Sequence, residues 1–71
     1  MIRERVQMLQ GNVDAVRVME LLLQQKRELK EAGYQENEIH LLPGMLVLQL
    51  EDGEVRWLAF DGEFKMEFWK N

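Results

Sequence analysis

Two Asp-Gly dipeptides in alternating apolar sequence, Asp52-Gly53 and Asp61-Gly62, constrain the fold of this chain more than any other feature. Asp-Gly favours the type I′ turn of a two-residue β-hairpin, because both central residues of that turn need a positive φ. Two consecutive turns predict a three-stranded antiparallel meander. Its strands are expected at about residues 45–51, 54–60 and 63–69.

Two-residue loops also fix the register of a hairpin, so Leu50 is expected opposite Val55 and Ala59 opposite Phe64. Side chains alternate between the two faces of each strand. One face of the meander is then wholly apolar and is expected to face the core. It carries Leu46, Leu48, Leu50, Val55, Trp57, Ala59, Phe64, Met66 and Phe68.

Residues 13–32 have the apolar spacing of an amphipathic helix, and Gly33 is well placed to end it. Residues 2–10 carry Ile2, Val6 and Leu9 at helical spacing, which predicts a short additional helix. Gly11-Asn12 separates the two, Gly11 as a C-cap and Asn12 as an N-cap. The alternative is one long helix with a bend at this point.

The apolar arc of helix 13–32 is wider than one sheet requires, because Val16, Leu21 and Leu23 lie outside the main stripe. A second element must therefore cover them. The sequence leaves two candidates for this role, residues 2–10 or a second subunit.

The predicted fold class is α+β in a single small domain, residues 1–71. An N-terminal helix or helical pair, at about 2–10 and 13–32, packs on one face of the three-stranded meander. Residues 34–44 form a connector in which 39–42 is a possible extra short strand. Pro43-Gly44 after it fits the centre of a type II turn.

The composition argues against an enzyme. The chain has no serine, threonine or cysteine, so the common side-chain nucleophiles are missing, and no cofactor-binding motif is present. His40 is the only histidine, which gives thin support for a metal site. The two Asp-Gly-Glu turns are expected at opposite ends of the sheet, where their carboxylates cannot share one ion. We therefore expect no catalytic, cofactor or metal residues.

The charge and hydropathy of the chain limit its expected cellular location and the classes of partner that it can bind. No stretch reaches the roughly 18 apolar residues of a membrane span, and the start does not resemble a signal peptide. A cytoplasmic protein that binds no membrane is expected. Residues 33–71 carry eight acidic and three basic side chains, which counts against nucleic acid as a partner.

The second face of the meander supplies the main candidate site. An apolar cluster on this face has charged neighbours, which is typical of a protein contact. The expected partner-binding residues are Met45, Val47, Leu58, Phe60, Arg56 and Trp69. We therefore expect a non-catalytic protein–protein interaction module, a small self-associating adaptor or regulator that forms a homodimer. The alternative for the cluster is that residues 2–10 or 39–42 cover it within one subunit.

Two other functions remain open. One is an acidic inhibitor of a nucleic-acid-handling enzyme, of the kind that phages and immunity systems encode. It would present Glu51, Asp52, Glu54, Asp61, Glu63 and Glu67 to a basic cleft. The other is a weak binder of single-stranded nucleic acid that uses Phe60, Trp69, Arg56 and Lys65. Placing Trp57 on the core face weakens this second alternative.

Overall fold

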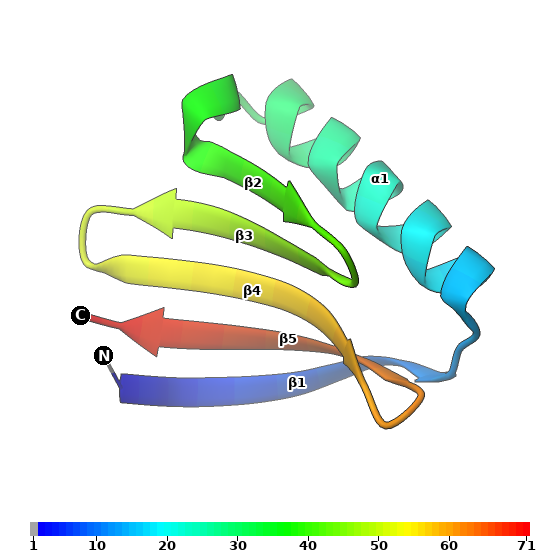
Figure 1. The fold of residues 1–71 in the computed structure, drawn as a ribbon. Helices are drawn as coiled ribbons and strands as arrows, with labels where there is room; N and C mark the ends of the chain where they lie inside the picture. Colours follow the sequence, from blue (N-terminus) through cyan, green and yellow to red (C-terminus); the bar gives the residue numbers. More distant parts are fainter. Residues whose placement is uncertain (1) are drawn as a thin grey trace.

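The computed structural model describes residues 2–71, except for the side chains of Gln10 and Phe60. In this part of the chain, five strands form one antiparallel sheet in the order β1-β5-β4-β3-β2, and one α-helix lies against one face (Figure 1). The elements in chain order are β1 (Ile2–Asn12), α1 (Ala15–Glu31), the short 3-10 helix η1 (Glu36–Glu38), β2 (Ile39–Leu42), β3 (Met45–Leu50), β4 (Gly53–Phe60) and β5 (Glu63–Lys70).

The N-terminal segment overturns the predicted fold. Residues 2–10 are not a helix but most of strand β1, which pairs antiparallel with β5. The prediction of an N-terminal helical pair on a three-stranded meander is therefore wrong. The helical spacing of Ile2, Val6 and Leu9 was a local signal. A long-range interaction outweighs this signal, because pairing of residues 2–10 with β5 satisfies the backbone groups along the outer side of that strand.

Helix α1 begins two residues later than predicted and ends one residue earlier. Its N-cap is Asp14 rather than Asn12: the Asp14 Oδ1 accepts a hydrogen bond of 2.8 Å from the backbone N–H of Arg17. The helix ends at Glu31, and Gly33 follows with a φ of 107°. Because β1 and β2 lie at opposite edges of the sheet, α1 crosses the sheet face to connect them (Figure 1).

The extra strand predicted at 39–42 is present as β2, paired with β3 through Leu42–Met45 and Ile39–Leu48. The Pro43-Gly44 turn joins the two strands, and Gly44 has a φ of 72°. The connector before β2 is tied to the helix. The Glu36 carboxylate lies 2.7 Å from Lys30 Nζ and 3.1 Å from Lys26 Nζ.

The second hairpin has the predicted register. Phe60 pairs with Glu63 and Ala59 with Phe64, around a turn in which Asp61 and Gly62 have φ values of 52° and 76°. Positive φ at both positions is the requirement of a type I′ turn, which explains Asp-Gly here.

The first hairpin has a different register from the predicted one. Leu50 pairs with Gly53 and Leu48 with Val55, so the two-residue loop is Glu51-Asp52 and Gly53 is the first residue of β4. Gly53 does not have a positive φ. It is needed for another reason, because a Cβ atom at this position would collide with the carbonyl oxygen of Trp69 in β5. The register differs by two residues, so each side chain keeps its predicted face.

The core lies between α1 and the predicted apolar face of the sheet. The helix contributes Val18, Leu22 and Leu29. Leu22 and Leu46 are 2% and 0% exposed, and complete burial of such a side chain stabilises the fold by about 2 kcal/mol. The sheet contributes Ile39, Leu46, Leu48, Trp57 and Phe64.

The outer side of α1 is only partly covered. Leu21 packs against the core, but Val16 and Leu23 are exposed, and strand β1 does not cover them. Of the two candidates for covering this side, residues 2–10 are therefore excluded for Val16 and Leu23, and a second subunit stays a prediction. In the described part of the chain, no helix is long and apolar enough to cross a membrane.

Candidate functional site: the open face of the sheet

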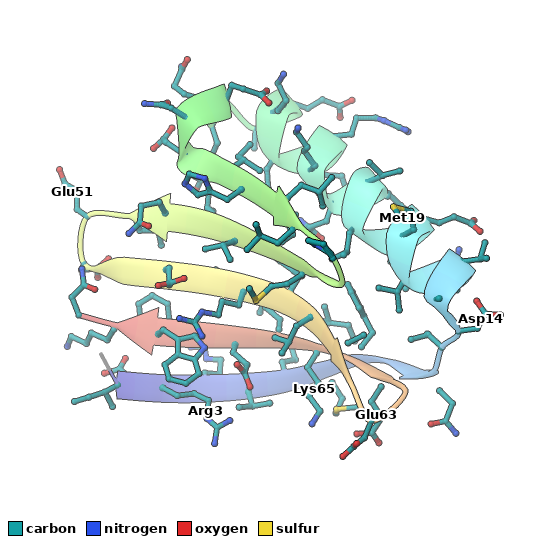
Figure 2. The ribbon with its side chains drawn as sticks, in the orientation of Figure 1. Arg3, Asp14, Met19, Glu51, Glu63 and Lys65 are labelled. Atoms are coloured by element: carbon teal, nitrogen blue, oxygen red, sulfur yellow. The ribbon has the colours of Figure 1, made fainter. Side chains whose placement is uncertain are left out.

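One face of the sheet packs against α1, and no helix or loop of residues 2–71 lies across the other, which we call the open face (Figures 1 and 2). The strand registers place its side chains in rows that run across the sheet. The predicted site residues Met45, Val47, Leu58, Arg56 and Trp69 belong to this face. The sixth, Phe60, has a side chain that lies outside the described residues.

One row of the open face crosses all five strands and is apolar except at one position. Its members are Leu42, Met45, Leu58, Lys65 and Met8. We call this row the apolar band. Its ends are exposed, Leu42 at 45% and Met8 at 48%, and its centre is half-buried. Neighbouring strands lie about 4.8 Å apart, so the band extends roughly 19 Å across the sheet.

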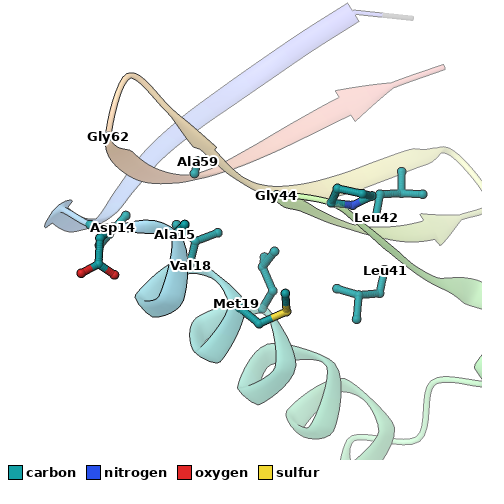
Figure 3. A pocket seen from close by; sticks show the side chains of 12 residues that line it. Asp14, Ala15, Val18, Met19, Leu41, Leu42, Gly44, Ala59 and Gly62 are labelled. Atoms are coloured by element: carbon teal, nitrogen blue, oxygen red, sulfur yellow. The ribbon is translucent and has the colours of Figure 1, made fainter.

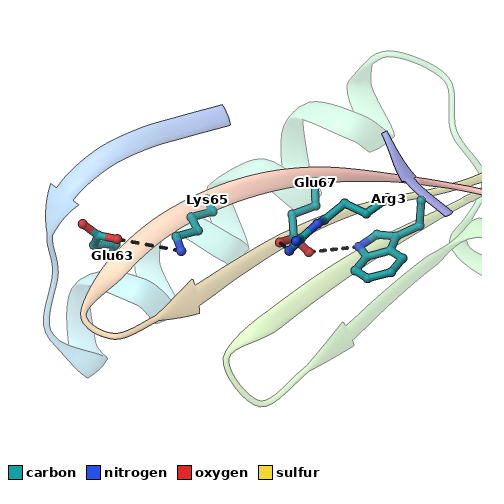
Figure 4. Close-up of polar contacts among 5 residues, drawn as sticks. Arg3, Glu63, Lys65 and Glu67 are labelled. Atoms are coloured by element: carbon teal, nitrogen blue, oxygen red, sulfur yellow. Dashed lines mark hydrogen bonds and ion pairs between the residues drawn. The ribbon is translucent and has the colours of Figure 1, made fainter. Parts of the chain in front are cut away.

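The exception in the band, Lys65, forms an ion pair on the open face. Its Nζ lies 3.8 Å from the carboxylate of Glu63 (Figure 4). The next row contains Val47, which is buried at the centre of the sheet between His40 of β2 and Arg56 of β4. The open face is therefore apolar near the Pro43-Gly44 end of β3 and more polar toward the other end.

The polar end of the open face is an ordered cluster around Glu67. This carboxylate is buried, and it accepts a hydrogen bond of 2.9 Å from Trp69 Nε1 and one of 3.2 Å from an Arg3 guanidinium N–H (Figure 4). The Arg56 guanidinium carbon lies 4.3 Å from the centre of the Trp69 ring and that of Arg3 5.8 Å away. The ring is therefore in contact with cations, which restricts its use for stacking a nucleic-acid base.

The charges on the open face balance. Arg56 Nε donates to Glu54 Oε2 at 3.0 Å, beside the Arg3–Glu67 and Lys65–Glu63 pairs. Arg56 also lies opposite Glu67, as the predicted register requires. Three basic and three acidic side chains of the described strands thus share this face, whereas the whole chain has a formal net charge of −4.

The elements that were candidates to cover the apolar cluster extend it instead. Residues 2–10 and 39–42 add strands β1 and β2 at the two edges of the sheet, beside the cluster rather than over it (Figure 1). They contribute Met8 and Leu42, which sequence reasoning missed. The alternation of Val6, Gln7 and Met8 was the signal for β1, but the helical spacing of the same segment concealed it.

The acidic residues of the inhibitor alternative do not form one patch. The Glu51-Asp52 and Asp61-Gly62 turns lie at opposite ends of the sheet (Figure 1). Glu54, Glu63 and Glu67 each lie beside a basic side chain. The inhibitor function stays a prediction that this arrangement does not strengthen. In the described part of the chain, no three imidazole or carboxylate groups gather where they could hold a metal ion.

A cleft lies on the helix side of the molecule, between the first half of α1 and the β2–β3 turn (Figure 3). This cleft has a volume of about 610 Å³. Its lining is mostly apolar and includes Val18, Met19, Leu22, Leu41 and Ala59.

The short helix η1 contributes an exposed carboxylate, Glu36, beside two lysines of α1. Hydrogen bonds from Lys30 and then Lys26, with the charges of both lysines, lower the pKa of its carboxyl group.

Comparison with known proteins gives no family to which the chain can be assigned. No protein-family model, curated protein or solved structure matches it significantly.

Proposed function

We propose that this chain is a non-catalytic protein-binding module that self-associates through its open face, with two copies stacked so that their apolar bands meet. The observation that carries the proposal is the apolar band itself. It crosses the full width of the sheet, its ends are exposed, and no element of residues 2–71 lies over it. Exposed apolar surface of this extent, bordered by charges, is typical of a protein contact.

Charge favours a second copy as the occupant. Two copies with a net charge of −4 each repel one another, and the repulsion is weakest where the facing surfaces are neutral. The open face has balanced charges, so it meets this condition. A two-fold axis through the face brings the same patch of both copies together, and this patch carries basic and acidic groups in equal number.

The size of the open face is sufficient for a stable pair. The longest extents of the molecule are 32 and 26 Å, and the sheet spreads in that plane. A standard interface buries about 800 Å² per partner, which such a face can supply. The polar cluster around Glu67 would then contribute a rim of hydrogen-bonding groups beside the apolar band.

The proposal is tested by light scattering over a dilution series. Met8→Lys places a charge at an exposed end of the band, and Leu58→Lys places one at its centre. Each is expected to raise the dimer dissociation constant at least tenfold, because a buried unpaired charge opposes association. Val16→Lys is the matched control, since Val16 is exposed on α1 and away from the sheet.

Three outcomes would refute the proposal. The first is a wild-type protein that stays monomeric at millimolar concentration. The second is a dimer that both band substitutions leave intact while circular dichroism shows the native fold. The third is a dimer that only Val16→Lys dissociates, which would assign the contact to the exposed side of α1.

A further inference from the structure

Strand β2 is an edge strand with backbone groups that face away from the sheet. The Ala59 N–H donates to the Gly44 carbonyl at 3.3 Å, so in β3 the residues in phase with Gly44 bond to β4 and the alternate ones bond to β2. His40 and Leu42 are therefore the β2 residues that bond to β3. The N–H and C=O of Leu41 point outward, as does the Ile39 carbonyl. The Ile39 N–H donates a hydrogen bond to the Glu36 carbonyl.

The apolar cleft opens beside this edge. Figure 3 shows the side chains of Leu41 and Met19 facing one another across it. Leu41 is 37% exposed and Met19 57% exposed, so neither is committed to the core. The volume of about 610 Å³ lies within the range of ligand-binding pockets. An outward-facing strand edge and an apolar cleft beside it are the two features that β-strand addition requires.

The pairing pattern of the sheet sets a direction for an added strand. All four pairs of neighbouring strands in the described sheet are antiparallel, and antiparallel pairing is slightly more stable per residue than parallel pairing. A strand that continues this pattern would run from the Gly44 end of β2 toward the Glu36 end.

We propose that β2 and this cleft bind an extended apolar peptide segment of a partner protein, which adds to the sheet as a sixth, antiparallel strand. The peptide backbone pairs with Leu41 and with the Ile39 carbonyl. Alternate apolar side chains of the peptide enter the cleft between Leu41 and Met19. A helical segment cannot satisfy the outward backbone groups of β2, because its own N–H and C=O groups are already paired within the helix. This site is separate from the open face and from the proposed self-association.

The probe is a displayed library of random octapeptides, selected on the immobilised full chain. The selected sequences are expected to alternate apolar and polar residues, and synthetic copies of them are then titrated. Met19→Glu is expected to weaken binding at least tenfold, because it places a charge in the cleft. Val16→Glu, one turn earlier on the exposed side of α1, is the matched control and should bind like the wild type.

Amide hydrogen exchange provides a readout specific to strand addition. The Leu41 amide should exchange at least tenfold more slowly with peptide bound, whereas the His40 amide, already paired with β3, should change little. The Leu58→Lys protein should bind the peptide normally, which separates this proposal from the proposed dimer. The proposal is overturned if the library yields no binder, if Met19→Glu binds as well as Val16→Glu, or if the Leu41 amide is unchanged in the complex.

Discussion

The two edges of the sheet differ in ways that bear on what each can bind. The β1 edge is 11 residues long and irregular, with register shifts between Arg3 and Arg5, between Met8 and Gln10, and between Gln10 and Asn12. The β2 edge is only four residues long, but its pairing with β3 has no irregularity. Bulges and charged side chains are the usual means by which edge strands avoid pairing with other chains. The long β1 edge is therefore protected against pairing with another chain, and the short β2 edge is accessible to an added strand.

Side-chain contacts reinforce this difference. The β1 edge is fixed to β5 by the pairs Arg3–Glu67 and Glu4–Lys70. The β2 edge has Leu41 and Leu42 partly exposed, and it is fixed mainly through the buried Ile39. An ordered but exposed edge suits a binding site, because the strand is already in the conformation that an added strand needs.

The largest expected effect tests how tightly the β1 side of the sheet is held. In Gly53→Ala, the new methyl group would collide with the backbone of β5 at Trp69, and a backbone cannot move aside as a side chain can. We expect a loss of about 3 kcal/mol in the free energy of unfolding, measured by urea denaturation at fixed protein concentration. Hydrogen exchange should show β5 and β1 losing more protection than β2 and β3.

Gly11→Ala in β1 is the control, because no atom lies near the position of its added Cβ and no positive φ is required there. Its free energy of unfolding should change by less than about 0.5 kcal/mol. Equal losses from the two substitutions would show that the close approach of Gly53 to β5 does not matter.

An intermediate effect is expected at the buried anchor of the β1 edge. In Glu67→Met, Trp69 Nε1 and the Arg3 guanidinium lose their shared acceptor. Leaving such donors without a partner costs about 2 kcal/mol, read as a lower midpoint of urea unfolding. Glu63→Met removes only the longer, more exposed pair with Lys65 and should cost less than about 0.5 kcal/mol. A smaller loss for Glu67→Met than for Glu63→Met would contradict this assignment.

The smallest effect concerns the β2 side, where Glu36 joins η1 to α1. Its pKa is lowered in the folded state by Lys30 and Lys26, so the ion pairs stabilise the fold above the unfolded pKa of about 4.5. That contribution is lost as the pH falls through the lower folded-state pKa. Glu36→Gln should therefore unfold slightly more easily than wild type at pH 7, and the difference should shrink as the pH is lowered below about 4.5. A difference that does not shrink with falling pH would assign the effect to something other than this charge.

Much of the sheet could be predicted from local signals. The turn at Asp61-Gly62, the turn at Pro43-Gly44 and the helix end at Gly33 each need a positive φ, and glycine or aspartate supplies it within a few residues. The first hairpin shows the limit of this reasoning. The nine apolar residues show only which side chains share a face. Registers that differ by two residues give the same faces, so the pattern could not distinguish the pair Leu50–Val55 from the observed Leu50–Gly53.

The candidate site was predictable only at its centre. Met45, Val47 and Leu58 share a face because they lie on neighbouring strands of one hairpin, whose turn is visible in the sequence. Met8 and Leu42 complete the band from strands far apart in the chain. The cleft beside β2 could not be predicted, because it depends on where α1 crosses the sheet.

The sequence by itself determined much of the local geometry: the turns at Asp61-Gly62 and Pro43-Gly44, the region where the helix stops, and which side chains of the meander face the core. These depend on φ preferences and on alternation, which act over a few residues. Only the tertiary structure decided that residues 2–10 form β1 instead of a helix. It also decided that Gly53 serves a close approach instead of a turn. Both depend on β5, which pairs with β1 across most of the chain length and meets Gly53 at Trp69, and the local sequence pattern does not specify either contact.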